Sequence, residues 1–112
     1  RSRVTGKIEF LGIKGEIANK SVLIFDDFIS TGGTLVKAAK FIKNKKAKRI
    51  TACVTHYLPV EGLSERLQKS LVDKIFVTNT LPIAKERKFP KLKVISIAPL
   101  IAERISDVKD RL

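Results

Sequence analysis

The chain has 112 residues, of which 44% are hydrophobic, enough for one small domain with a modest core. It carries 23 lysines and arginines but only 11 aspartates and glutamates, so its formal net charge of +12 favours anionic partners. No apolar run approaches the roughly 18 to 20 residues that span a bilayer, and the first residues lack the apolar core of a signal peptide. We therefore expect a cytoplasmic protein with no membrane partner.

The first half of the chain predicts strands followed by a loop and a helix. Residues 7–13 alternate loosely between polar and apolar side chains, which indicates a strand or hairpin leading into a sheet. Four consecutive apolar residues at 22–25 predict a central strand of a parallel sheet, buried on both faces. A helix is expected over 33–44, with an apolar face made by Leu35, Ala38, Ala39 and Ile42.

The second half continues the alternation of strand and helix that is typical of an α/β fold. Residues 50–55 predict a buried strand in which Cys53, the only cysteine, packs as a small core side chain. A helix with leucines at 63, 67 and 71, and with Ser64 as its cap, is expected next. The remaining expected elements are strands over 74–77 and 93–97 and a C-terminal helix that begins near Pro99 and covers the sheet.

Two adjacent carboxylates and a glycine-rich loop follow the strand at 22–25. In open α/β sheets, ligands bind beyond the carboxyl ends of the strands, so Asp26 and Asp27 lie where a ligand is expected. Glycines permit a tight turn and close backbone approach, and successive N–H groups ahead of a helix can bind a phosphate. The candidate phosphate-binding residues are Ser30, Thr31, Gly32, Gly33 and Thr34.

Asp26 and Asp27 suit a different part of the same ligand. Carboxylates repel a phosphate, but they can accept hydrogen bonds from ribose hydroxyls or bind Mg²⁺. The segment therefore predicts a site for a pentose phosphate. The alternative is a strand end with solvated acids followed by an ordinary turn, which would make the ordered combination of strand, acids, loop and helix accidental.

Three other polar segments are open to two interpretations each. His56, the only histidine, is either a site residue or a polar loop residue, and it has no neighbouring cysteine or carboxylate pair for a zinc site. Residues 78–80 either approach the ligand or form a turn. The basic run 43–49, with Lys37 and Lys40, is interpreted as solvated surface, since one tyrosine and no tryptophan leave little for a base-stacking nucleic-acid platform.

The string VLIFDDFISTGGT at 22–34 resembles the phosphoribosyl-pyrophosphate (PRPP) loop shared by PRPP synthetases and type I phosphoribosyltransferases. The segments VTH, VTNTLP and APLIAE, at 54–56, 77–82 and 98–103, resemble PRPP synthetases in order and spacing. The resemblance implies an α/β, three-layer parallel-sheet domain of the type I phosphoribosyltransferase kind. Ser30, where many bacterial members carry Asp, looks more like the archaeal version.

The resemblance covers residues 1–112 but only the C-terminal half of that family's chain, so we expect the N-terminal half to be absent. It implies ribose-phosphate diphosphokinase activity, in which diphosphate passes from ATP to ribose 5-phosphate to form PRPP and AMP. It also implies Mg²⁺ as cofactor, ATP bound mainly through the absent half, a homo-oligomer and no nucleic-acid partner. On this interpretation the 112-residue chain alone is inactive.

The same resemblance assigns roles to residues. Asp26 and Asp27 would bind the ribose or its metal, and residues 30–34 would bind the 5-phosphate. Residues 1–6 would end a flexible catalytic loop, with Arg1 and Arg3 as catalytic residues. The alternatives that stay open are a type I phosphoribosyltransferase, a catalytically silent regulatory subunit and, more distantly, a basic nucleic-acid module.

Overall fold

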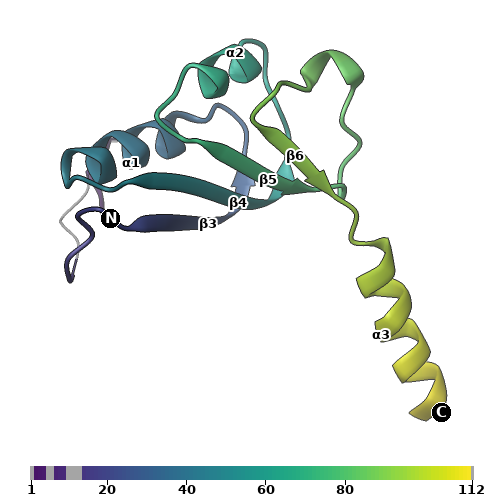
Figure 1. Cartoon of the computed structure of the whole chain (residues 1–112). Coiled ribbons are helices and arrows are strands. Elements are labelled where there is room, and N and C mark those ends of the chain that lie inside the picture. The colour runs from purple at the N-terminus through teal and green to yellow at the C-terminus, as the bar shows by residue number, and fades with distance from the viewer. Residues whose placement is uncertain (1, 5–6, 10–13, 112) are drawn as a thin grey trace.

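Four parallel strands form the sheet on which the rest of the chain is arranged (Figure 1). The computed structural model describes residues 2–4, 7–9 and 14–111. The strands lie side by side in chain order: β3 (Ser21–Ile29), β4 (Arg49–Tyr57), β5 (Lys74–Thr78) and β6 (Leu92–Ile95). They are connected by α1 (Gly33–Asn44), α2 (Leu63–Gln68) and the short 3₁₀ helix η1 (Lys85–Arg87).

The described N-terminal residues form a separate two-stranded sheet. Strand β1 (Ser2–Val4) pairs antiparallel with β2 (Lys7–Glu9). The strand or hairpin expected over 7–13 is thus observed for its first three residues, and residues 10–13 lie outside the described part of the chain.

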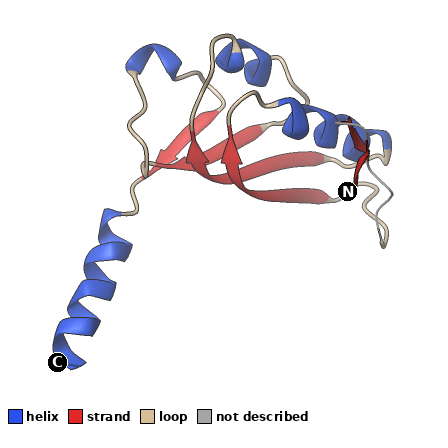
Figure 2. Ribbon diagram, turned by 180° about the vertical axis from the view of Figure 1, so that it is seen from behind, coloured by secondary structure: helices blue, strands red, loops and turns tan. Residues whose placement is uncertain are grey.

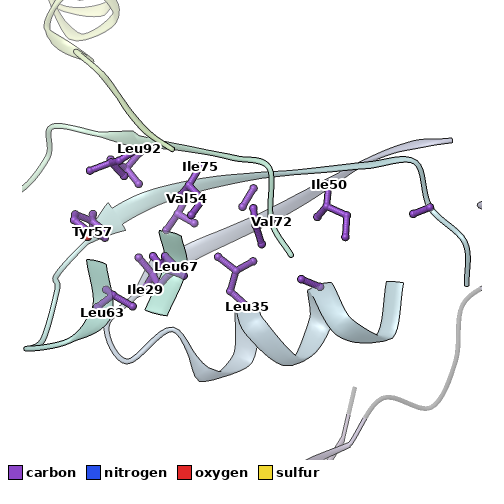
Figure 3. Packing of buried hydrophobic residues seen from close by; sticks show 14 residues of the cluster. Ile29, Leu35, Ile50, Val54, Tyr57, Leu63, Leu67, Val72, Ile75 and Leu92 are labelled. Atoms are coloured by element: carbon purple, nitrogen blue, oxygen red, sulfur yellow. The ribbon is translucent and has the colours of Figure 1, made fainter. Parts of the chain in front are cut away.

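Helices α1 and α2 cover one face of the four-stranded sheet, and the core lies between them and the strands (Figures 1 and 2). A cluster of 14 buried hydrophobic residues fills this layer. Figure 3 shows Leu35 of α1 and Leu63 and Leu67 of α2 close to Ile29 and Val54 of the strands. The α/β fold with a parallel sheet that the sequence predicts is confirmed.

Strand β3 differs from the expected central strand, because it lies at the edge of the four-stranded sheet. Val22 and Ile24 pack against the core, whereas Leu23 and Phe25 are 59% and 74% exposed on the other face. The expectation of burial on both faces is therefore wrong for the described residues. Cys53, expected in the core, is half-buried and lines a cavity on this same open face.

Helix α1 has the predicted bounds, but α2 is shorter than its leucine pattern suggests. The helix ends at Gln68, so Leu71 lies beyond it and is exposed. Ser64 is not the cap, because Gly62 occupies that position with a φ of 83°. The Ser64 hydroxyl instead donates to the Arg87 carbonyl at 2.8 Å, which ties α2 to η1.

Helix α3 (Ala98–Arg111) begins near Pro99 as predicted, but it does not cover the sheet. It extends away from the strands (Figure 1), and all of its residues are exposed. Asn79 fixes the preceding connector, since its Oδ1 accepts from the Ile97 amide at 3.0 Å and its Nδ2 donates to the Ser96 hydroxyl at 3.3 Å. Within the described ranges, no helix has the length and apolar character needed to cross a membrane.

The fold predicts an alkaline loss of stability that depends on Tyr57, the only tyrosine. Its side chain is fully buried, and this burial raises its pKa above the ordinary value, although the nearby Ser64 hydroxyl and Arg87 act in the opposite direction. The unfolded chain therefore loses the phenolic proton first, and the free energy of unfolding should fall as the pH rises above about 10. In Tyr57→Phe the part of this fall that is due to Tyr57 should disappear. Urea unfolding of both proteins at several alkaline pH values measures the difference. Identical alkaline slopes in the two proteins would contradict the prediction.

Candidate functional site

The regular alternation of side chains slips by one residue near the carboxyl ends of β3 and β4. Ile24 and Ile29 both pack in the core although they are five residues apart, and Val54 and Tyr57 do so although they are three apart. Side chains on one face of a regular strand are separated by an even number of residues. The ladder between the two strands has no pair at Asp27. The irregularity thus coincides with the predicted acidic pair.

Asp26 and Asp27 are both exposed and line two cavities. One cavity of about 240 Å³ lies between the acids and the glycine-rich loop. The other, of about 890 Å³, lies along the open face of the sheet and is lined in part by Phe25, Phe76 and Ile95. The Asp26 carboxylate accepts a hydrogen bond from the Asp27 amide at 2.8 Å, which orients one of the two side chains.

The backbone of the loop is held by the segment that follows β4. Three consecutive carbonyls, from the last residue of β3 into the loop, accept hydrogen bonds from residues 58–66, two from backbone amides and one from a guanidinium group. The pairs are Leu58 N with Ile29 O at 2.9 Å, Val60 N with Ser30 O at 3.4 Å, and Arg66 Nη1 with Thr31 O. We call these three contacts the carbonyl clamp.

The carbonyl clamp determines the direction of the loop's N–H groups. The described peptide bonds are all trans, so a carbonyl and the N–H of the next residue point in opposite directions. The N–H groups of Ser30, Thr31 and Gly32 therefore point away from residues 58–66. Those of Thr31 and Gly32 have no hydrogen-bond partner among the described residues. Adjacent unpaired donors ahead of a helix suit an anion.

Gly32 is the loop residue at which a side chain would be strained. Its φ is +76°, and an added Cβ would lie 2.5 Å from Leu63 Cδ1. Gly33 is different, because it begins α1 without a positive φ, and a Cβ there would meet only Thr31 Oγ1 at 3.8 Å. The two glycines, which the sequence pattern treats alike, thus have unequal steric requirements.

The structure brings together six of the seven residues predicted to bind the sugar phosphate. They line the cavity of about 240 Å³, and the exception is Gly33. The six are Asp26, Asp27, Ser30, Thr31, Gly32 and Thr34. Of the two predicted catalytic arginines, Arg3 lies in β1, opposite Ile8, and Arg1 lies outside the described residues.

His56 and two threonines form a polar network at the carboxyl ends of β4 and β5. His56 Nδ1 lies 2.8 Å from Thr80 Oγ1. The hydroxyls of Thr78 and Thr80 both donate to the Thr55 carbonyl. Thr78 also lines the larger cavity, whereas Asn79 serves the connector to α3. Within the described chain, no three His, Cys, Asp or Glu residues are grouped as they would be around a metal ion.

The basic residues of α1 and of the run 43–49 lie at the surface, as the sequence predicts. Lys37 and Lys40 of α1 are exposed, and Lys43 donates to the Lys48 carbonyl at 3.3 Å. Arg66, in contrast, was missed. A single arginine in a six-residue helix has no spacing or motif that marks it, and only the folded loop shows what it contacts.

The model of the phosphoribosyl synthetase-associated domain family matches residues 4–111. The chain belongs to this family. The match covers the whole candidate site, including the acidic pair, the loop and the carbonyl clamp.

The chain is also similar to curated proteins named ribose-phosphate pyrophosphokinase. It is 47% identical to the one from Aquifex aeolicus (strain VF5) over 104 residues, which are 93% of this chain and 33% of that protein. For the one from Thermosipho africanus (strain TCF52B), the identity is 41% over 93% of this chain and 32% of that protein. For ribose-phosphate pyrophosphokinase 2, chloroplastic, from Arabidopsis thaliana, the identity is 37% over 91% of this chain and 26% of that protein.

A solved structure gives the same family assignment. The crystal structure of phosphoribosylpyrophosphate synthetase from Mycobacterium smegmatis superimposes with a TM-score of 0.80 and 36% sequence identity, covering 88% of this chain and 33% of that one. The chain thus spans about a third of the length of the relatives it matches. The relatives named here are bacterial and plant proteins, so they give no support to the expected archaeal character.

Exchanging each glycine for alanine tests the geometry of the loop. We expect Gly32→Ala to lower the free energy of unfolding by about 1–2 kcal/mol, because a side chain is forced into the left-handed region and displaces Leu63. Gly33→Ala is the matched control and should cause no loss, since alanine suits a helical position with free space. Urea unfolding of both variants measures the difference. Equal losses would show that the loop does not have this conformation.

Proposed function

We propose that this chain is the ribose-5-phosphate-binding domain of a ribose-phosphate pyrophosphokinase, the enzyme that forms PRPP and AMP from ATP and ribose 5-phosphate. The C-terminal location of the domain, a cytoplasmic setting and a homo-oligomeric assembly belong to the same proposal. The family membership and the pyrophosphokinase relatives support this function over that of a phosphoribosyltransferase.

The observation that carries the proposal is the cavity between the acidic pair and the clamped loop. The residues that line it differ in chemistry, because Thr31, Gly32 and Thr34 carry hydroxyls or unpaired backbone N–H groups, whereas Asp26 and Asp27 carry carboxylates. A phosphate suits the donors, and sugar hydroxyls suit the carboxylates. A pentose phosphate contains both groups a few bonds apart, so one small molecule satisfies both sets of residues.

The acidic pair also fits a Mg²⁺ ion. Magnesium is commonly bound through one or two carboxylates, with water and substrate phosphates completing its shell. Asp26 and Asp27 are exposed and have no ion-pair partner among the described residues, so their oxygens are accessible to such an ion. When bound, Mg²⁺ would neutralise phosphate charge. The chain's own residues would hold the sugar in one orientation relative to the incoming diphosphate.

Calorimetric titration of the 112-residue chain with ribose 5-phosphate tests the proposal. We expect saturable, weak binding in the presence of Mg²⁺ and none with ribose, which lacks the phosphate. Incubation with ATP and ribose 5-phosphate should release no AMP, because this domain alone is proposed to supply only the sugar-phosphate half of the site. Failure to bind ribose 5-phosphate, or robust AMP release by the purified chain, would overturn the proposal.

Substitution of the acids should separate sugar recognition from phosphate recognition. In Asp26→Asn and Asp27→Asn, the amide keeps the size of the side chain but loses its charge, so ribose 5-phosphate affinity with Mg²⁺ should fall by about an order of magnitude. Binding of inorganic phosphate should persist or strengthen, because a nearby negative charge has been removed.

Asp110→Asn is the matched control for this pair. It removes the same charge from exposed helix α3, far along the chain from the loop, and should leave both affinities unchanged. If the Asp26 and Asp27 variants behave like this control, the acids are merely solvated residues at the end of β3.

A further inference from the structure

Arg66 is the one side chain in the carbonyl clamp, since the other two donors are backbone amides. It does not line the cavity that the predicted ligand residues surround. Its guanidinium instead reaches the loop from behind and donates to the Thr31 carbonyl. In the described part of the chain no carboxylate forms an ion pair with Arg66, so its positive charge is not neutralised by a nearby acid.

We propose that Arg66 is a positioning residue for phosphate binding, an inference that rests on the proposed function. The Thr31 carbonyl belongs to the same peptide group as the Gly32 N–H. A cation bound to the carbonyl oxygen draws electron density from that peptide and makes the N–H a stronger donor. The contact also fixes the peptide plane. Arg66 thus orients and polarises a donor that faces the phosphate without touching the phosphate itself.

The packing of the helix that carries Arg66 supports this role. Leu63 and Leu67, on either side of it in α2, are fully buried. Both leucines also lie against Gly32, at 2.5 Å and 3.5 Å from the position of an added Cβ. The helix that carries the guanidinium is therefore packed directly on the residue whose N–H the guanidinium polarises. An exposed arginine on a packed helix keeps its direction better than one on a free loop.

Variants of Arg66 distinguish positioning from the general attraction of a basic protein. Arg66→Ala should weaken ribose 5-phosphate binding about tenfold, because the Gly32 N–H would be a weaker and less well oriented donor to the phosphate. Arg66→Lys, which keeps the charge but not the planar donor geometry, should recover part of the loss. Addition of guanidinium chloride at non-denaturing concentration should partly restore binding by Arg66→Ala.

Lys69→Ala is the matched control, because it removes one exposed positive charge from the position directly after the same helix. Its affinity should stay within about twofold of the parent chain, as expected for a screened surface charge. Wild-type affinity in Arg66→Ala would overturn the inference. So would an equal loss in Lys69→Ala, because charge alone would then account for the effect.

A ligand-free measurement keeps this test independent of the proposed function. The amide proton and nitrogen NMR shifts of Gly32 and Thr31 should change in Arg66→Ala and not in Lys69→Ala, since only the first variant alters the peptide between them. Unchanged shifts in Arg66→Ala would overturn the positioning role even if ribose 5-phosphate binds. Changed shifts with no binding by the parent chain would support the clamp contact and refute the proposed ligand.

Discussion

The binding of three consecutive carbonyls, at the end of β3 and in the loop that follows, is the interaction on which the candidate site depends. A loop between a strand and a helix has backbone donors and acceptors pointing in both directions, and an anion is repelled by any acceptor that faces it. Here residues 58–66 bind the carbonyls of Ile29, Ser30 and Thr31. The N–H groups of the loop then point away from residues 58–66. The contacts on one side of the loop thus set the direction of the donors on its other side.

This arrangement makes α2 part of the site although none of its side chains lines the small cavity. The leucines of α2 require a residue without a side chain at position 32, and its arginine holds the preceding carbonyl. A ligand that prefers the clamped loop would therefore also favour the docked helix, by mutual linkage. Such a ligand would therefore stabilise the packing of α2 on the loop.

The sequence predicted the order of the helices and strands and the residues of the loop better than it predicted how these elements pack against one another. The bounds of α1 and the residues around the small cavity follow from local patterns, because apolar periodicity and glycine chemistry act within a few residues. The edge position of β3 and the direction of α3 do not follow from such patterns. The position of β3 depends on the order in which the strands pair, and the direction of α3 depends on contacts such as those of Asn79 with residues 96–97. Arg66 was missed for the same reason.

The edge position of β3 has a consequence for association between molecules. A nine-residue edge strand with exposed Leu23 and Phe25 offers unpaired backbone groups and apolar side chains to a strand from another chain. Natural sheets reduce this hazard by placing charges on the edge strand. Asp26 and Asp27 stand within β3, directly after its most exposed aromatic ring. The acids that we propose as ligand-binding residues are thus also placed to oppose edge-to-edge aggregation, and substituting them should lower solubility even where binding is not measured.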